Sequence, residues 1–351
     1  MGATLDDIAK KVGVSKTTVY RALNSKSRIS EKTRELILKT AKELKYVPNT
    51  LASGLRSKRS MVIGLIFSDL IAAHFYAEIF HGIEDVATRN NYGVIFACSN
   101  GRIEKETKLL TLFSERQVDG IIVAPTWGID INCYLRLKDQ RIPFIFIDKS
   151  LDNITTDIVT TDDFTGGIEA TEYLIGLGHQ KIAILLGPEY PCSTIEKRIE
   201  GYRHALKSNG LKYEKIINLH KNIQNQKEYG YLAIQNYLDQ AEHDATAFFA
   251  INDSLAIGAI KAFRERGFKI PEDVSIIGYN NDEIDRFFDV QLTTVSQPKY
   301  EMGRKAMELL LQRINHRNES EADDNYYYIN MKPELIIRES CGENPGKGII
   351  S

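Results

Sequence analysis

TLDDIAKKVGVSKTTVYRALN, residues 4–24, contains two short amphipathic helical patterns separated by one glycine. Apolar residues recur at helical spacing on each side of the break, so each helix has one face that must be buried. Thr4 and Ser15 stand where N-caps belong, and the glycine can take the left-handed conformation of a sharp helix stop. The outward face of the second helix carries Lys16 and Arg21 among polar groups. This stretch predicts a helix-turn-helix with a cationic recognition face.

The two helices alone also fit a surface hairpin with a solvated charged face. Two neighbouring segments favour the helix-turn-helix. A third helical pattern begins at Ser30, and its apolar residues can close a small core over the first two helices: Leu36, Ile37, Ala41 and Leu44. Residues 48–59 then form a basic segment, with a helix-compatible proline at its start.

The segment from Thr4 to Arg59 resembles the DNA-binding headpiece and hinge of the LacI/GalR (lactose/galactose repressor) family of bacterial transcriptional regulators. The matching residues, in the family's order and spacing, are Val14-Ser15, Thr18-Val19, Arg21, Asn24, Thr33-Arg34, Tyr46, Pro48-Asn49, Ala52 and Leu55. The resemblance extends over nearly the whole chain. It implies a repressor, not an enzyme, that binds a palindromic operator as a homodimer. It also implies allosteric control by a small metabolite, a sugar or sugar derivative.

The recognition helix over residues 16–24 is expected to lie in the major groove. There Lys16 and Arg21 can donate to guanine, while Thr17 and Tyr20 can bond or pack against base edges. Other polar residues suit phosphates, which position a protein without specifying sequence. With the hinge, the candidate DNA-binding residues are Thr4, Ser15, Lys16, Thr17, Thr18, Tyr20, Arg21, Asn24, Thr33, Asn49, Ala52 and Leu55.

The hinge, residues 50–57, is too short to be a stable helix by itself. The resemblance implies that it forms when two copies pack together on DNA, and that Leu55 then wedges into the central minor-groove step. In the alternative, Leu55 packs on its own domain. Residues 1–47 are therefore expected to form the DNA-binding domain, and residues 48–60 the hinge and linker.

Charge is unevenly distributed along the 351 residues. Residues 1–60 contain 14 Lys and Arg against five Asp and Glu, a net charge of +9, while the remainder has a net charge of −11. A basic head on an acidic body fits a nucleic-acid contact confined to one end. The four scattered cysteines predict neither a zinc site nor a disulfide framework, and no cofactor or metal is expected. With no signal-like or membrane-spanning run, the sequence predicts a cytoplasmic protein.

Beyond residue 61, short apolar strands alternate with helical patterns, which predicts parallel sheets covered by helices. Two such sets in tandem predict two doubly wound lobes of periplasmic-binding-protein type, with a ligand cleft between the carboxyl edges of their strands. The overall fold class is therefore α/β, with a small all-α head. The resemblance implies three chain crossings between the lobes, so that lobe 1 takes about 61–161 and 293–321, and lobe 2 about 162–292 and 322–338. A polar tail, residues 339–351, is expected to follow.

Polar and aromatic side chains gather at the expected strand ends. The candidate effector-binding residues are Phe75, Tyr76, Ser99, Asp148, Lys149, Thr194, Arg198, Asn252 and Asn280. By resemblance, Arg198 clamps effector hydroxyls or a carboxylate, and Asn280 stands where the family often has an aspartate. Other roles remain open: Arg198 could form a structural ion pair, Phe75 could belong to the core, and Trp127 could be a stacking platform or a rim residue. Aromatic rings among polar groups favour a polyhydroxylated ligand.

The two alternative classes of function are an enzyme and a solute-binding receptor. An enzyme is disfavoured because the sequence contains no P-loop, no G-x-G-x-x-G after a strand, no H-E-x-x-H and no G-x-S-x-G. A solute-binding sugar receptor without a DNA role has the same two-lobed form. The basic head argues against that alternative.

Overall fold

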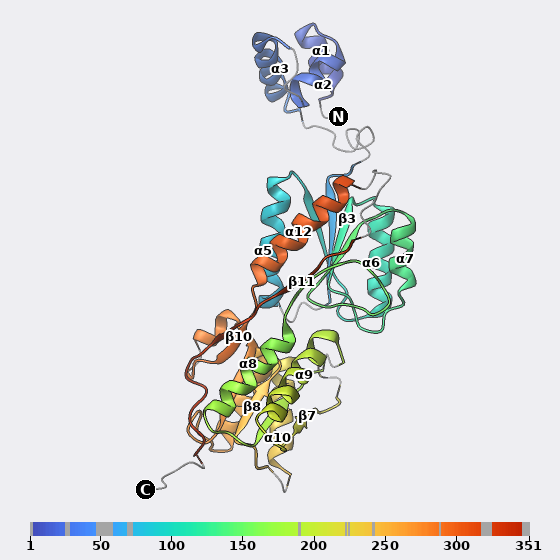
Figure 1. Cartoon of the computed structure of the whole chain (residues 1–351). Helices are drawn as coiled ribbons and strands as arrows, with labels where there is room; N and C mark the ends of the chain where they lie inside the picture. Colours follow the sequence, from blue (N-terminus) through green and yellow to red (C-terminus); the bar gives the residue numbers. More distant parts are fainter. Residues whose placement is uncertain are drawn as a thin grey trace. The chain divides into compact units, whose positions relative to one another are not determined.

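The computed structural model describes residues 3–24, 29–46, 59–68, 73–188, 191–221, 223, 225–240, 243–287, 289–316 and 325–345 (Figure 1). The chain divides into two compact units, residues 1–60 and 61–351. The predicted hinge contacts Asn49, Ala52 and Leu55 lie outside the described residues, so the hinge helix stays a prediction.

The described part of the first unit contains three helices: α1 (Leu5–Val12), α2 (Lys16–Asn24) and α3 (Glu31–Glu43). Their buried residues form one small core: Ile8, Ala9, Val19, Ala22, Ile37 and Ala41. Gly13 ends α1 with a φ of 75°, as its place in the sequence predicts. Leu36 was expected to close this core, but its side chain is 50% exposed. Ile37, Thr40 and Ala41 define the buried face of α3, and Leu36 lies outside it.

Lobe 1 of the second unit is built on a parallel six-stranded sheet in the order β11-β5-β4-β3-β1-β2. Its strands are β1 (Val62–Phe67), β2 (Gly93–Cys98), β3 (Gly120–Val123), β4 (Phe144–Ile147), β5 (Asp157–Thr161) and β11 (Tyr328–Met331). Figure 1 shows helices on both faces: α5 (Ala73–Arg89) and α12 (Lys299–His316) on one, α6 (Ile103–Glu115) and α7 (Asn132–Asp139) on the other. Each face has its own apolar core, as expected for strands buried on both sides.

Lobe 2 has a second six-stranded sheet, in the order β12-β10-β9-β8-β6-β7, with β12 antiparallel at one edge. Its strands are β6 (Ile182–Leu185), β7 (Lys215–Ile217), β8 (Ala247–Ala250), β9 (Ser275–Asn280), β10 (Thr293–Ser296) and β12 (Glu334–Ile336). Its helices are α8 (Asp163–Gly176), α9 (Ser193–Ser208), α10 (Gln226–Leu238), α11 (Asp253–Glu265) and the 3-10 helix η1 (Glu283–Arg286). The two doubly wound lobes confirm the predicted fold class.

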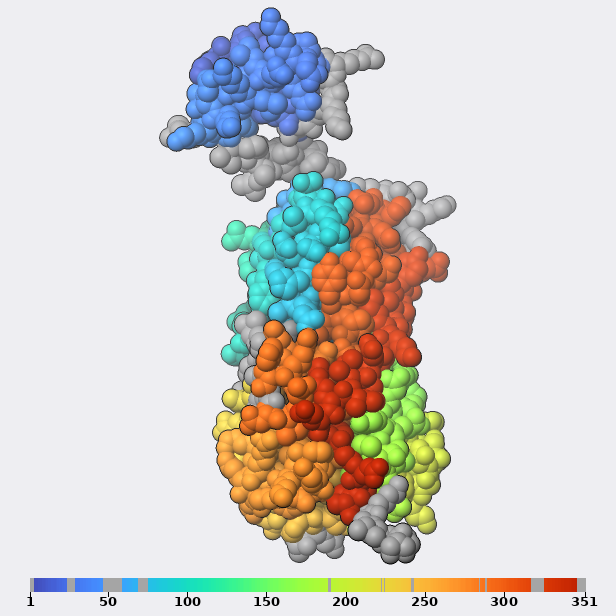
Figure 2. All heavy atoms as spheres, turned by 90° about the vertical axis from the view of Figure 1, so that its left-hand side faces the viewer, coloured from blue at the N-terminus to red at the C-terminus, as the bar shows by residue number. Residues whose placement is uncertain are grey.

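Two of the three predicted crossings between the lobes are misplaced. Strand β10 pairs with β9 in lobe 2, although residues from 293 onward were expected in lobe 1. Strand β11 pairs with β5 in lobe 1, although residues from 322 onward were expected in lobe 2. The chain therefore crosses after β5, between β10 and α12, and between β11 and β12, and Figure 2 shows the red C-terminal segment passing from one lobe to the other. The threonine-rich strands β5 and β10 lack the long apolar runs that marked the others.

The C-terminal segment is not a free polar tail over its described part. Ser340 is fully buried, and its hydroxyl donates to the carbonyl oxygen of Ile276 at 2.5 Å. The backbone N–H of Asn344 donates to the carbonyl oxygen of Leu177 at 3.0 Å. Residues 339–345 thus pack against lobe 2 through backbone and hydroxyl hydrogen bonds, which do not depend on apolar side chains. Among the described helices, none is both long and apolar enough to cross a membrane.

Candidate functional site in the helical head and the interlobe cleft

Several candidate DNA-binding residues lie at the helix N-termini of the head. The hydroxyl of Thr4 accepts the N–H of Asp7 at 3.3 Å, and the Asp7 carboxylate accepts the N–H of Thr4 in return. Ser15 accepts the N–H of Thr18 at 3.1 Å, and Thr33 pairs through its hydroxyl with the N-cap Ser30 at 2.7 Å. The predicted N-caps of α1 and α2 are confirmed. Backbone N–H groups at helix N-termini attract anions, so these places suit phosphate contacts.

Helix α2 presents the predicted recognition face. Lys16, Thr17 and Arg21 are exposed and Tyr20 is half-buried, while Val19 and Ala22 on the opposite side anchor the helix in the core. The ammonium group of Lys16 lies 2.7 Å from the carboxylate of Asp6, and both side chains are more than half exposed. An exposed ion pair contributes at most about 1 kcal/mol, so DNA can displace it. Asn24 is the last residue of α2.

Eight of the nine candidate effector residues line one cavity between the two lobes. Lobe 1 contributes Phe75 and Tyr76 of α5 with Asp148 and Lys149 after β4. Lobe 2 contributes Thr194 and Arg198 of α9, Asn252 before α11 and Asn280 at the end of β9. The cavity holds about 40 Å³. That is close to the roughly 30 Å³ that one water occupies in the liquid.

The lobe 1 wall is a connected polar network beside stacked rings. The hydroxyl of Tyr76 donates to the Asp148 carboxylate at 2.9 Å and lies 3.2 Å from the hydroxyl of Ser68. Lys149 donates to the same Ser68 hydroxyl at 3.1 Å. The ring of Tyr76 stacks on Phe67 at a centroid distance of 4.3 Å and meets Phe75 edge-on. These contacts fix Tyr76 and Asp148 before any ligand arrives, which lowers the entropy lost on binding.

Arg198 dominates the lobe 2 wall. Its Nε donates to the Asp163 carboxylate at 2.8 Å, its Nη1 donates to the carbonyl oxygen of Ile251 at 2.6 Å, and its guanidinium lies 3.7 Å from the ring centre of Tyr279. Both charged side chains are buried. Burial raises the pKa of Asp163 to about 6, against the lowering effect of Arg198. The structural ion pair that the sequence left open for Arg198 is therefore present. The same arginine also lines the cleft.

A close approach of α8 and α9 places Arg198 against Asp163. A Cβ atom on Gly201 would lie 2.2 Å from the carbonyl oxygen of Phe164, and one on Gly167 would lie 2.5 Å from the carbonyl oxygen of Arg198. Any side chain at either position would push the helices apart. Gly201, three residues after Arg198, and Gly167 on the neighbouring helix thus serve the geometry of the cleft.

Ser99 is the one candidate effector residue that does not line the cleft. Its fully buried side chain turns into the layer between the sheet and α6. There the Ser99 hydroxyl donates to the carbonyl oxygen of Phe67 and lies 3.2 Å from the hydroxyl of Thr126. Glu106 accepts hydrogen bonds from Thr126 and Tyr134 in the same layer. Ser99 follows β2, but its side chain lies outside the lining of the cleft. Trp127, 38% exposed, is also outside the lining.

Among the described residues, four that the sequence analysis did not single out also line the cleft: Ile195, Gln226, Ile251 and Gln297. Gln226 begins α10, the helix that follows β7. Thr194 was predicted from the same kind of position, at the start of the helix that follows β6. Gln297 lies in the crossing after β10, and its amide donates to Asn280 at 2.8 Å. The resemblance assigned residue 297 to lobe 1, beyond the crossing expected near residue 292. With these two amides, the wall offers both donors and acceptors.

Asp282 lies beside the cleft among other carboxylates. It is 8% exposed, and its backbone N–H donates to the Asp253 carboxylate at 2.9 Å. Burial first, and then the neighbouring Asp253, raise the pKa of Asp282 to about 7, which Lys299 only partly offsets. In the folded protein the pKa of Asp282 lies above the ordinary value of 3.8, so the protonated carboxyl stabilises the fold relative to the ionised one. This contribution to the free energy of unfolding is fully present below about pH 4. That contribution is lost as the pH rises through 7.

We expect Asp282→Asn to stabilise the protein at high pH. At pH 8 the free energy of unfolding should exceed that of the wild type by about 1–3 kcal/mol, and the difference should shrink by pH 5. Urea unfolding at the two pH values measures it. Asp289→Asn, at an exposed carboxylate, serves as the control and should be neutral at both. An equal difference for Asp282→Asn at pH 5 and pH 8 would show that the carboxyl does not titrate as described.

A helix-turn-helix head joined to two lobes that enclose a ligand cleft defines a DNA-binding regulator under metabolite control. Comparison with known families supports this class: residues 4–49 match the lacI family of bacterial regulatory proteins, and residues 171–341 match a periplasmic binding protein-like domain. The chain is 36% identical over 338 residues to the HTH-type transcriptional repressor PurR of Pasteurella multocida, which covers 96% of this chain and 98% of that protein. The chain belongs to the LacI family and is a transcriptional repressor with a metabolite-binding domain.

Other relatives agree in architecture. The ribose operon repressor of Haemophilus influenzae is 32% identical and covers 96% of this chain and 98% of its own length. The lac repressor dimer bound to operator and the anti-inducer ONPF matches with a TM-score of 0.82 and 26% identity, covering 97% of this chain and 99% of that one. A LacI family regulator of Enterococcus faecium with bound ribose matches with a TM-score of 0.70 and 33% identity, covering 80% of this chain and 99% of that one.

Proposed function

We propose that this repressor binds a palindromic operator in the cytoplasm as a homodimer, and that a sugar or sugar derivative in the interlobe cleft controls its affinity for DNA. The observation that carries the proposal is the cleft itself. Side chains predicted from the sequence, contributed by five separate strand ends and helices of both lobes, line one cavity. A ligand that touches both lobes stabilises one relative arrangement of them.

The lining favours a polyhydroxylated ligand. Lys149 and Arg198 donate, Asp148 accepts, and the amides of Gln226, Asn280 and others do both. A sugar hydroxyl also donates and accepts, so it can pair with such a mixed wall. Phe75 and Tyr76 add aromatic surface against which the apolar face of a sugar ring packs. The Enterococcus faecium regulator solved with bound ribose supports the same class of ligand for this chain.

Ligand entry requires the lobes to move apart. A cavity of about 40 Å³ is far below the roughly 300 Å³ at the lower end of small-molecule sites. Lys299 ties the lobes at a crossing: its ammonium lies 2.7 Å from the Glu78 carboxylate of α5 and donates to the carbonyl oxygen of Asn281 at 3.2 Å. We infer that ligand binding resets this contact and the spacing between the lobe 1 domains of the dimer. That spacing then decides whether two hinges can pair on DNA.

The edge of the lobe 1 sheet is the surface that we propose for dimerisation. Strand β2 ends the sheet, and its Ile95 and Phe96 are 44% and 42% exposed. Ile103 and Leu112 of the neighbouring α6 are also exposed. An open apolar sheet edge favours association with another chain. Pairing through lobe 1 also places two heads on one DNA site.

We expect Ile95→Glu to weaken dimerisation and operator binding together. Two buried charges at a twofold interface disfavour association, since the same residue faces its copy or a near neighbour. Analytical ultracentrifugation should show a dimer–monomer equilibrium shifted at least tenfold toward the monomer. Ile337→Glu changes an isoleucine that is 60% exposed on lobe 2 and should leave the dimer intact. A fully dimeric Ile95→Glu protein would exclude this edge as the interface.

A thermal-shift screen tests the ligand. Ribose, phosphorylated pentoses and hexoses, disaccharides and nucleobases should be compared at equal concentrations. A ligand that binds the folded state raises the Tm, by an amount set by its concentration relative to its Kd. We expect a rise with at least one sugar and none with nucleobases. A rise with nucleobases alone would overturn the sugar proposal while leaving the repressor assignment untouched.

A further inference from the structure

A second pocket lies in lobe 2, outside the effector cleft. It is lined by Leu186 after β6, Ile199 and Arg203 of α9, Ile216 of β7, and Asn218 and His220 in the segment after β7. Its volume is about 260 Å³. That is roughly eight times the 30 Å³ that a water occupies in the liquid, and near the lower end of small-molecule sites.

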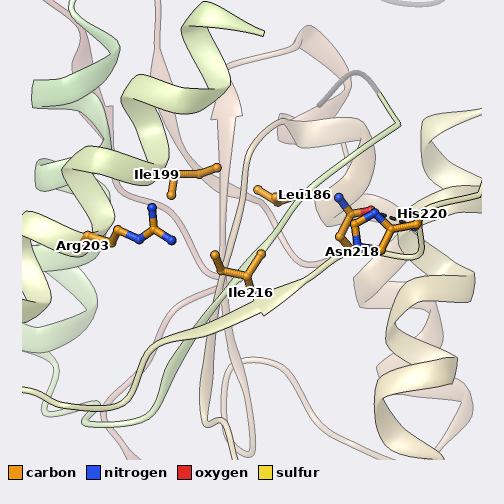
Figure 3. Close-up of a pocket in the computed structure, with 6 residues that line it drawn as sticks. All are labelled: Leu186, Ile199, Arg203, Ile216, Asn218 and His220. Carbon is orange, nitrogen blue, oxygen red and sulfur yellow. Dashed lines mark hydrogen bonds between the residues drawn. The ribbon is translucent and has the colours of Figure 1, made fainter. Parts of the chain in front are cut away.

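The lining separates into an apolar floor and two polar ends. Figure 3 shows Ile199, Leu186 and Ile216 in the middle, with the guanidinium of Arg203 on one side and Asn218 and His220 on the other. Leu186 and Ile199 are nearly fully buried, and Ile216 is 37% exposed on the edge strand. A ligand in this pocket would therefore contact aliphatic groups along its body and polar groups at its ends.

The polar groups that remain for a ligand are mostly donors. The Oδ1 of Asn218 already accepts the hydroxyl of Tyr229 at 2.5 Å and the N–H of His220 at 2.9 Å, so its Nδ2 is left. Arg203 uses its Nε for Glu214 at 2.7 Å. Within the described part of the chain, its two Nη groups and the His220 ring make no hydrogen bond. A guanidinium and an amide nitrogen donate only, and an imidazole has at least one N–H.

We propose that this pocket binds a small organic carboxylate whose acid group pairs with Arg203 and whose apolar body lies on Leu186, Ile199 and Ile216. A carboxylate accepts two parallel hydrogen bonds from a guanidinium, which matches the two Nη groups of Arg203. An acceptor at the far end of the ligand meets Asn218 and His220. The mixed donor and acceptor wall of the effector cleft suits hydroxyl groups, whereas this donor-rich pocket suits an anion.

The two sites lie on adjoining faces of α9. Thr194 and Arg198 face the cleft, and Ile199 and Arg203 face the second pocket. Ile195, one turn before Ile199, lines the cleft end of this second face. Among the residues that the structure describes, none lines both cavities. A ligand in the second pocket therefore need not displace a ligand from the cleft.

Ligand-observed NMR titration of the full-length protein tests the proposal. The probes are adipate and 4-hydroxybenzoate, each compared with its neutral amide, adipamide or 4-hydroxybenzamide. We expect at least one acid to bind at least tenfold more tightly than its amide. Arg203→Gln should remove that preference, and Glu214→Gln should strengthen it, because it releases the guanidinium from its partner. Arg203 and Glu214 are about half exposed, so neither change should unfold the protein.

Two further variants test whether the acid binds in this pocket or at another cationic site. Lys207→Gln removes an exposed charge one turn further along α9 and should leave acid binding unchanged. Lys149→Met removes a cation from the effector cleft and should also leave it unchanged. The proposal is overturned if neither acid is preferred over its amide, or if the preference survives Arg203→Gln. It is equally overturned if Lys149→Met abolishes the preference, which would place the acid in the effector cleft.

Discussion

Arg198→Ala should abolish the ligand-induced rise in Tm and destabilise the second unit. The substitution removes the guanidinium from the effector cleft and leaves the buried Asp163 carboxylate without its ion-pair partner. Removing one member of a buried ion pair costs about 3–5 kcal/mol. Urea unfolding and a thermal-shift titration with the effective ligand measure the two effects.

A double variant separates stability from ligand binding. Arg198→Ala combined with Asp163→Asn removes the uncompensated charge and should recover most of the lost stability, but not the ligand response. Lys197→Ala, on the exposed side of the same helix, is the matched control and should respond to ligand like the wild type. If the double variant binds ligand with wild-type affinity, Arg198 is a structural residue only.

Arg21→Ala and Lys16→Ala should each reduce the preference for operator over other DNA. A side chain that donates to a guanine edge contributes about 1–3 kcal/mol of discrimination. A dimer changed in both heads then loses about 2–6 kcal/mol, so its affinity for operator falls about 30-fold or more. Fluorescence anisotropy with the operator and with a scrambled duplex measures the loss.

The control for the head variants is Arg136→Ala, which removes an exposed charge from α7 in the second unit. It should change operator binding little. A phosphate contact behaves differently from a base contact: Thr33→Ala should weaken binding to both duplexes by a similar factor. An equal loss on operator and scrambled duplex for Arg21→Ala would assign Arg21 to the phosphate backbone as well.

The sequence predicted most of the helices and strands because their cores follow simple periodicities. Continuous apolar runs such as residues 63–67 and 144–147 fall on buried parallel strands. β5 and β10 escaped prediction because their threonines break that pattern, although their backbones pair in the sheets. The lobe boundary near residue 293 came from the resemblance, and β10, which pairs with β9 of lobe 2, lies beyond it. Tyr328 of β11 pairs with Ile158 of β5, and contacts between residues so far apart in the chain leave no local pattern.

The sequence predicted those cleft residues that lie at or near the ends of strands. Phe75, Asp148, Thr194 and Asn252 all lie near the ends of predicted strands, and all line the cavity. Ser99 satisfied the same rule but faces the helix layer, because position along a strand does not tell which way the residue after it turns. Gln297 and the donor-rich pocket at Arg203 depend on how separate elements pack, which periodicity does not encode.

The central claim is that one palindromic DNA site and one metabolite act on each other through this chain. The direct measurement has two steps. Purified protein first selects duplexes from a random pool. The best duplex is then titrated with the protein, with and without each candidate ligand. We expect a preferred palindrome whose Kd changes at least tenfold with one sugar, and an equal reciprocal change in the affinity for that sugar. A protein that prefers no duplex over random DNA, with or without any ligand, would contradict it.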